Sequence, residues 1–117
     1  MNINEKMKEL EAVVGCDVEQ DIYSGNGERY ITFTYEDERP ELCGDNRPLA
    51  DTVYVQISYY CPKGYSYMAD KHKIRDYLEK QGFKVTNIRC WLENELTGYQ
   101  NIRHLIFETT YTQTRRK

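Results

Sequence analysis

The segment from Asp51 to Phe83 constrains the fold more than any other part of the chain. Its first ten residues, 51–60, alternate between two kinds of side chain, with the period of a half-buried β-strand. One face of this strand carries Val53, Val55, Ile57 and Tyr59. Pro62 cannot donate to a strand ladder, so we expect it to close the strand.

A helix is predicted directly after this strand, over residues 66–81. The apolar side chains at helical spacing are Tyr67, Ile74 and Leu78, widened by Met68 and Tyr77. Ser66 is the expected N-terminal cap, because its hydroxyl can accept an otherwise unpaired backbone N–H. Gly82 suits a left-handed C-terminal cap, and Phe83 beyond it can pack back on the helix. A strand, a turn and a helix therefore form the expected centre of the fold.

A second amphipathic helix is predicted over residues 1–15. Asn2 or Asn4 can cap its start, and Gly15 ends it. Its apolar stripe consists of Ile3, Met7, Leu10 and Val14. We expect this helix to cover one face of a sheet.

Two antiparallel hairpins account for the remaining strands. Residues 17–23 and 29–35 alternate on either side of the turn signal Ser24-Gly25-Asn26-Gly27, which predicts the first hairpin. Residues 84–93 and 101–112 alternate on either side of a turn-like segment and predict the second. The tail at 112–117 is polar and is expected to fray.

The segment 36–51 is predicted to be a long charged loop, since it holds two Arg-Pro pairs, a glycine and many charges. A connection of this length is uncommon in a small domain unless it has a function. One interpretation is a binding arm that contacts a neighbouring subunit. The other is a solvated linker or a long hairpin tip, and charge runs by themselves favour this second interpretation.

The expected order is α-β-β-β-α-β-β, which indicates an α+β fold with a mostly antiparallel sheet and two helices packed on one face. A chain of 117 residues suggests a single domain, 1–117, with a modest core. Apolar residues make up only 39% of the chain, whereas tyrosine occurs 11 times. Because tyrosine buries its ring and keeps its hydroxyl wet, this balance fits a thin domain that buries more area in an assembly.

Composition and charge argue against several classes of partner. The formal net charge of −3 and a pI near 5.4 are unlike those of a nucleic-acid-binding domain. We expect no membrane segment, because no apolar run approaches the roughly 20 residues that a spanning helix needs. The N-terminus lacks the pattern of a signal peptide, so a cytoplasmic location is expected. The four cysteines are widely spaced and predict reduced thiols rather than a metal site.

No catalytic constellation is evident, and we expect neither catalytic residues nor a cofactor. Cys61 and His72 could in principle act as a nucleophile and its base, supported only by the turn that precedes the helix. His72 lies among lysines and His104 in the middle of a strand, so each is most simply a surface or interface residue. Tyr54 and Tyr60 share a strand face, and tyrosine is enriched at protein–protein contacts. They are candidate interface residues, with a wet sheet face as the equal alternative.

The sequence resembles the small tail-terminator, or tail completion (minor tail), proteins of long-tailed bacteriophages and prophages. The segments that carry the resemblance are 30–35, 37–42, 51–60, 63–66, 81–83, 91–98 and the strand that contains His104. The resemblance covers nearly the whole chain, and its order of elements also matches.

The resemblance implies a structural protein that forms a ring, typically hexameric, at the end of the tail tube. Such a ring stops tube polymerisation and presents a surface for joining the head, so the implied partners are the chain itself, the tail tube and head-completion proteins. The implied location is the host cytoplasm during assembly and then the virion tail. Because a cyclic ring uses heterologous contacts, Arg39, Glu41 and Arg47 are candidates for contacts with opposite charges on a neighbour.

Other functions stay open at the level of sequence. The chain could be a different head–tail connector or a minor capsid component. It could instead be a stand-alone module that binds a peptide by adding a strand to an open sheet edge. A small enzyme that uses Cys61 and His72 is the third alternative, which rapid and selective alkylation of Cys61 would favour.

Overall fold

The computed structural model describes residues 2–42, 48–93 and 102–115. The elements follow the order α1 (Ile3–Val14), β1 (Asp17–Gln20), β2 (Tyr30–Leu42), β3 (Pro48–Pro62), α2 (Met68–Lys80), β4 (Lys84–Glu93) and β5 (Ile102–Thr114). The predicted α+β class and the order α-β-β-β-α-β-β are confirmed. Among the described residues, no helix is both long and apolar enough to cross a membrane.

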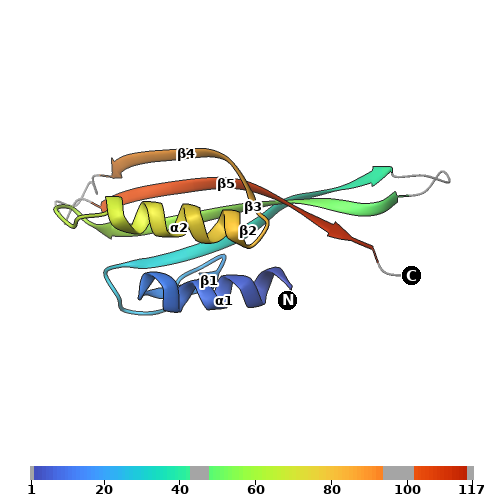
Figure 1. The fold of residues 1–117 in the computed structure, drawn as a ribbon. Coiled ribbons are helices and arrows are strands. Elements are labelled where there is room, and N and C mark those ends of the chain that lie inside the picture. Colours follow the sequence, from blue (N-terminus) through green and yellow to red (C-terminus); the bar gives the residue numbers. More distant parts are fainter. Residues whose placement is uncertain (1, 43–47, 94–101, 116–117) are drawn as a thin grey trace.

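The sheet has the strand order β1-β2-β3-β5-β4, and both helices lie against one of its faces (Figure 1). Strand β3 is central, with antiparallel β2 on one side and antiparallel β5 on the other. The hairpin predicted between β4 and β5 is confirmed as an antiparallel pair. The central strand therefore contains residues 51–60, the segment whose alternation predicts a strand.

The predicted alternation of β3 is confirmed by burial. The face toward the helices carries Val53, Val55, Ile57 and Tyr59, which are at most 3% exposed. The opposite face carries Thr52, Tyr54, Gln56 and Tyr60, which are half-buried, and the small, buried Ser58. A side-chain period of two places each set on its own face.

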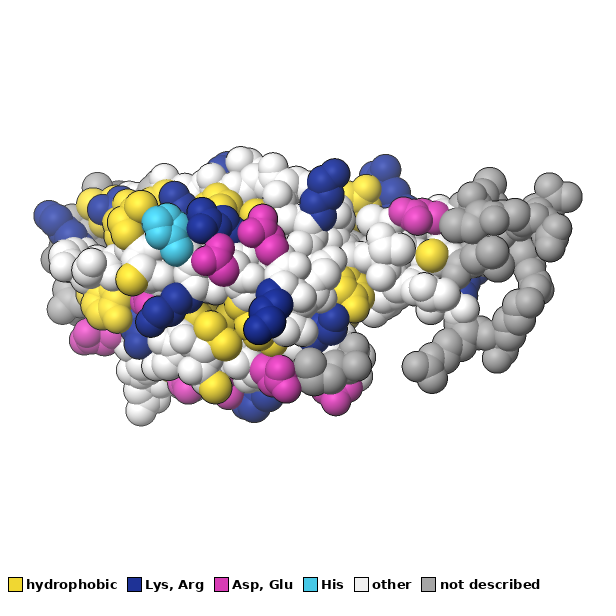
Figure 2. All heavy atoms as spheres, in the orientation of Figure 1, with side chains coloured by type: hydrophobic (Ala, Val, Ile, Leu, Met, Phe, Trp, Pro, Cys, Tyr) yellow, Lys and Arg dark blue, Asp and Glu magenta, His cyan; other side chains and the backbone are white. Residues whose placement is uncertain are grey.

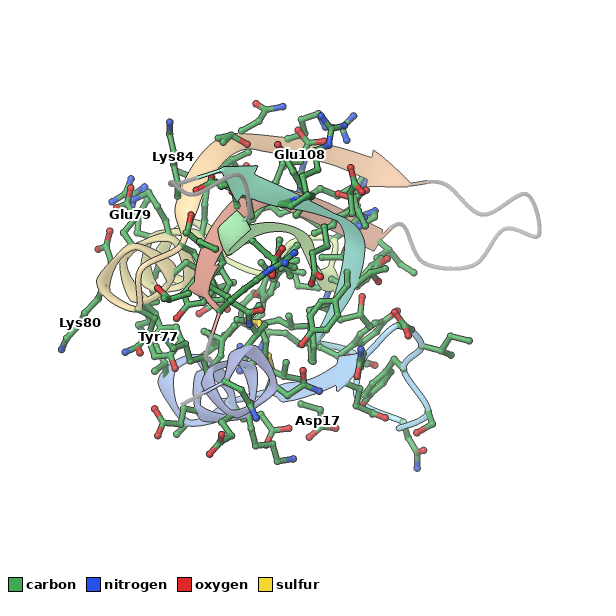
Figure 3. The ribbon with its side chains drawn as sticks, turned by 90° about the vertical axis from the view of Figure 1, so that its right-hand side faces the viewer. Asp17, Tyr77, Glu79, Lys80, Lys84 and Glu108 are labelled. Carbon is green, nitrogen blue, oxygen red and sulfur yellow. The ribbon has the colours of Figure 1, made fainter. Side chains whose placement is uncertain are left out.

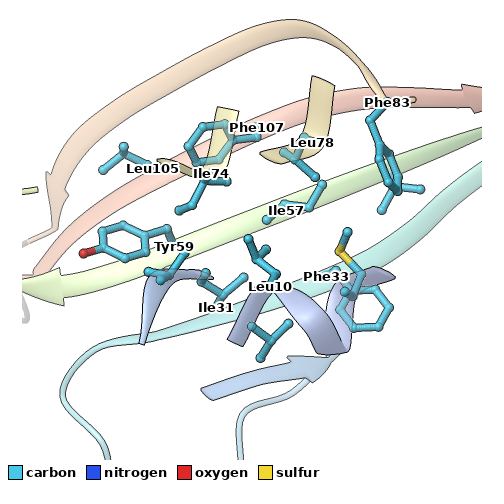
Figure 4. Packing of buried hydrophobic residues seen from close by; sticks show 14 of the residues in the cluster. Leu10, Ile31, Phe33, Ile57, Tyr59, Ile74, Leu78, Phe83, Leu105 and Phe107 are labelled. Atoms are coloured by element: carbon cyan, nitrogen blue, oxygen red, sulfur yellow. The ribbon is translucent and has the colours of Figure 1, made fainter. Parts of the chain in front are cut away.

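The buried side chains form one cluster between the sheet and the two helices (Figure 4). Helix α1 contributes Ile3, Met7, Leu10 and Val14, and helix α2 contributes Ile74 and Leu78. The sheet contributes Ile31, Ile57, Tyr59, Leu105 and Phe107, all fully buried. Each such side chain stabilises the fold by about 1.5–3 kcal/mol relative to its exposed state.

The caps of the helices follow the sequence with one correction. Asn2 forms a capping box with Glu5 at the start of α1, and Gly15 ends this helix in a left-handed conformation with φ of 83°. At the start of α2 the prediction of a Ser66 cap is wrong, because Tyr67 occupies that position and makes no side-chain capping bond. The Tyr67 ring lies instead 4.9 Å from the Arg103 guanidinium of β5.

The end of α2 is as predicted. Gly82 has a φ of 95°, in the left-handed region that only glycine adopts without strain. The N–H of Phe83 donates to the carbonyl oxygen of Leu78, and its side chain is 2% exposed. This arrangement satisfies carbonyl groups that the last helical turn would otherwise leave unpaired.

The prediction that residues 17–23 and 29–35 form a hairpin is wrong, because β1 runs parallel to β2. The intervening segment folds back along the sheet, so that the Tyr23 ring stacks on Tyr30 with a centroid distance of 4.0 Å. The Tyr23 hydroxyl donates to the Asp17 carboxylate and accepts from the N–H of Gly27. These bonds hold the segment between β1 and β2 against the start of β2. A two-residue hairpin turn would instead make the two strands antiparallel.

The predicted loop over residues 36–51 is also corrected. Residues 36–42 continue β2 and residues 48–51 begin β3, and they pair through Glu41 and Ala50. Thr114 of β5 pairs with Ala50 on the other side, so the tail expected to fray from residue 112 is strand as far as Thr114. Ladder pairing holds residues 37–42, 48 and 50–51 in strands, although few of the described side chains there are buried.

A buried ion pair joins the helices to the sheet. Asp70, in the first turn of α2, is 5% exposed and lies 3.1 Å from the guanidinium of Arg29. It also accepts a hydrogen bond from the Tyr59 hydroxyl of β3. Arg29 donates in addition to the carbonyl oxygens of Val14 and Gly15 at the end of α1. Asp70 therefore links α2 to β3 directly and to the end of α1 through Arg29.

Candidate functional site: the strand arm

Three strands extend past the helices and give the molecule a length of 58 Å against widths of 28 and 24 Å (Figure 1). We call this extension the arm, and it consists of residues 36–42 of β2, 48–54 of β3 and 110–114 of β5. A register shift between Tyr35 and Asp37 marks its beginning on β2. A bulge of this kind increases local twist and redirects a strand, so it helps to set the direction of the arm.

Arg39 and Tyr54, both candidate interface residues, are brought together on the arm. The Arg39 guanidinium lies 5.4 Å from the centre of the Tyr54 ring and forms an ion pair with Asp37 at 2.8 Å. The hydrogen bond from Arg39 lowers the pKa of the Asp37 carboxyl. The Arg39 side chain is 69% exposed, so the arm presents a guanidinium that is already oriented by two neighbours.

The other candidates lie in three different places. Glu41 is exposed near the end of the arm, where it accepts a hydrogen bond from the Thr52 hydroxyl. Arg47 lies outside the described residues. Tyr60 is at the opposite end of β3, beyond the arm. The structure thus brings Arg39, Glu41 and Tyr54 onto one extension and separates Tyr60 from them.

Tyr60 belongs to a row of aromatic rings that crosses three strands and the segment between β1 and β2. Its ring stacks on Tyr30 at 4.7 Å and on His104 at 4.1 Å. Tyr23 extends the row beyond Tyr30. Since β3 lies between β2 and β5, the two stacking contacts use both faces of the Tyr60 ring. This row orders the helix-free face of the sheet, as cross-strand aromatic pairs do.

An ion pair between Asp51 and Arg115, which the sequence did not predict, joins β3 to the end of β5 on the arm. Arg115 contacts both carboxylate oxygens of Asp51, at 2.9 and 2.6 Å. Arg115 follows the last residue of β5 and lies in the segment 112–117, which the sequence predicts to fray. The opposite charges of Asp51 and Arg115 can be read in the sequence, but only the antiparallel pairing of β3 with β5 brings the two side chains together.

The Asp51 carboxyl should titrate below pH 3.8, its ordinary value, because the hydrogen bond from Arg115 lowers its pKa. A depressed folded-state pKa stabilises the arm above the unfolded pKa, and this contribution is lost as the pH falls through the folded value. NMR titration of the Asp51 side chain checks this. The Arg115→Gln variant should move the midpoint back toward 3.8, and an unchanged midpoint would contradict the pairing.

The pairing of Cys61 with His72 finds no support in the structure. Cys61 is fully buried on the helix-covered face of β3, whereas His72 is exposed on α2. Burial raises the pKa of the Cys61 thiol, which opposes formation of the nucleophilic thiolate. Cys16, Cys61 and Cys90, the cysteines in the described part of the chain, are free thiols. No group of three or more His, Cys, Asp or Glu side chains there is placed to hold a metal ion.

A shallow depression of about 400 Å³ lies between the start of α1 and β1. Its lining includes Val18 and Phe33 as apolar residues and Asn2, Asn4 and Gln20 as polar ones. The amide groups pair within the chain, since Asn4 donates to Gln20 and accepts from the Tyr35 hydroxyl. The depression is therefore a surface feature whose polar side chains already have partners.

The sequence was compared with protein families and with curated proteins. No protein-family model matches the sequence. No curated protein matches it either.

Proposed function

We propose that this chain is a structural protein of a phage or prophage, a tail terminator that forms a ring, caps the tail tube and contributes to head–tail joining. Support comes from the sequence resemblance and from one structural observation, the three-stranded arm that projects past the helices (Figure 1). An arm of paired strands with few buried side chains gains little from its own core. Contact with another subunit would bury the surface that it leaves exposed.

The arm suits a heterologous contact, in which one patch meets a different patch on the next copy. Residues 36–42 carry four acidic side chains and one basic side chain, and the described side chains among them are exposed. Arg39 is held by Asp37 and Tyr54, and side chains that are ordered before binding lose less entropy on contact. Arg39, Glu41 and Tyr54 are therefore proposed contacts, and Arg47 and Tyr60 are proposed on the sequence alone.

The proposed partners are further copies of the chain, the tail tube and head-completion proteins. We propose that the protein has no catalytic residue and no cofactor, and that neither a membrane nor a specific nucleic acid is its partner. The proposed location is the host cytoplasm during assembly and then the virion tail. A different head–tail connector or minor capsid component would use the same surfaces. A stand-alone peptide-binding module is a second candidate, favoured by the outer edge of β4, which pairs with no strand in the described structure.

Absolute mass by light scattering after size exclusion tests the ring. The expected result is a closed oligomer near six times the chain mass of 14.0 kDa, at a mass that does not rise with concentration. High salt should shift this oligomer toward the monomer, because the Debye length falls from about 10 Å at 0.1 M to about 3 Å at 1 M. A mass that grows continuously with concentration would indicate an open filament and contradict the ring.

A further inference from the structure

The edges of the sheet differ in how they are protected. Along β1 the outer edge is covered by α1, since the Glu11 carboxylate accepts from the N–H of Val18 and Asn4 donates to Gln20. Strand β1 pairs with β2 only as far as Phe33, so the described structure leaves the outer edge of residues 34–42 unpaired. At the other side of the sheet, β4 pairs only with β5. An unpaired strand edge presents backbone donors and acceptors that can add another strand.

The surroundings of the β2 edge of the arm and of the β4 edge carry opposite charge. Residues 36–42 hold four acidic side chains and one basic one, a formal net charge of −3. Residues 71–89, which contain most of α2 and the first part of β4, hold six basic side chains and two acidic ones, a net charge of +4. Basic side chains lie over α2 with acidic ones among them (Figure 2), and Lys80 and Lys84 lie on the same side of the molecule as Glu79 (Figure 3).

Opposite charge decides which pairing is favoured. Two arms that met along β2 would place acidic strands side by side. Two β4 edges that met would bring together Lys84 and Arg89 with their copies. An acidic β2 edge against the basic β4 edge of another copy avoids both conflicts.

We propose that the outer edge of β2 in the arm of one copy adds as a strand to the outer edge of β4 in the next copy, with the acidic residues of the arm facing the basic surface of α2 and β4. The two edges lie on opposite sides of one sheet, so each copy can use both at once. Repetition of this contact generates a ring when its rotation closes. The inference rests on the proposed ring and assigns its subunit contact.

Charge reversal on each edge tests this contact. The arm variant carries Glu36→Lys and Glu38→Lys, and the β4-side variant carries Lys80→Glu and Lys84→Glu, all at exposed positions. Each variant alone should lose the oligomer and run as the monomer, because the opposite charges of the two surfaces then no longer match at any contact. An equal mixture of the two variants should recover the oligomer, and so should one chain that carries all four changes.

Two controls and one local measurement make the result specific. Glu28→Lys and Lys63→Glu change exposed charges at the end of the sheet away from the arm and should leave the oligomer intact. Hydrogen exchange should be slower in β4 of the oligomer than in β4 of either reversed variant, because new backbone hydrogen bonds protect amides. Circular dichroism confirms that each variant is folded.

The outcomes separate this contact from the proposed function. A wild-type oligomer that survives both reversals, or a mixture that fails to recover it, overturns the strand addition and leaves the ring standing. Recovery by the mixture in an open filament or a dimer supports the strand addition and contradicts the tail-terminator ring. A wild-type chain that stays monomeric at every concentration contradicts both.

Discussion

Replacing Asp70 with alanine should lower the free energy of unfolding by about 3–5 kcal/mol, because it leaves the partly buried Arg29 without its carboxylate. Asp70 is 5% exposed and also accepts from the Tyr59 hydroxyl, so the change strands a second buried polar group. Its position in the first turn of α2 adds a favourable interaction with the helix dipole. Urea denaturation followed by circular dichroism measures the loss.

Asp76→Ala is the matched control for Asp70→Ala. Asp76 lies on the same helix and pairs with Arg75, but its side chain is 65% exposed. Exposed ion pairs contribute about 0–1 kcal/mol, so this variant should unfold close to the wild type. The Asp70→Asn variant keeps the shape of the side chain and should fall between the two. Equal stability of the Asp70 and Asp76 alanine variants would show that Asp70 does not link the helices to the sheet.

Replacing Phe107 with alanine should cost about 3–5 kcal/mol, through lost burial and the cavity left behind. Phe107 is fully buried at the centre of β5, in the same cluster as Ile74 of α2 and Ile57 of β3 (Figure 4). Thermal and urea unfolding should both show the loss, with an unchanged dependence on urea if the variant still unfolds in one step.

Thr112→Ala, an exposed change on the same strand, is the control for Phe107→Ala and should alter stability by less than about 0.5 kcal/mol. Since Thr112 lies on the arm and Phe107 on the body, the pair also separates the stability of the core from that of the arm. A loss below 1 kcal/mol for Phe107→Ala would mean that the helices and the sheet share no rigid core. In that case the arm would not be held in a fixed position relative to the helices.

Local patterns in the sequence predicted the elements that bury a face. The apolar stripe of α1, the alternation of β3 and the left-handed cap at Gly82 each follow from a short stretch of sequence. Burial selects these patterns directly, since a period of 3.6 or 2 places apolar groups on one side. The class, the element order and the helix-covered face could therefore be derived without the structure.

The direction of β1 could not be derived in this way. Ser24-Gly25-Asn26-Gly27 carries the turn chemistry of a hairpin, yet β1 runs parallel to β2. The direction is held by tertiary contacts, namely the stacking of Tyr23 on Tyr30 and the hydrogen bond that the N–H of Val18 donates to the Glu11 carboxylate of α1. Turn propensity is a short-range signal, and tertiary contacts override it.

The candidate site, too, could be predicted from the sequence only in part. Sequence singled out Arg39, Glu41 and Tyr54 by residue type, but it assigned residues 36–51 to a loop. A strand held by its neighbours on a ladder needs no buried face, so residues 36–42 carry no alternation by which to recognise it. The pairing of Asp51 with Arg115 joins residues 64 positions apart and follows only from the register of β3 with β5.

The sequence by itself determined which segments of this protein bury apolar side chains, and hence its helices, its central strand and its α+β class. Only the tertiary structure decided the parallel direction of β1 and the extension of three strands into an arm. It also decided that β2 in the arm and β4 each keep an outer edge without a partner strand. The physical reason is range. Burial periodicity is written in neighbouring residues, whereas strand direction, register and ion pairing depend on groups that meet only once the chain has folded.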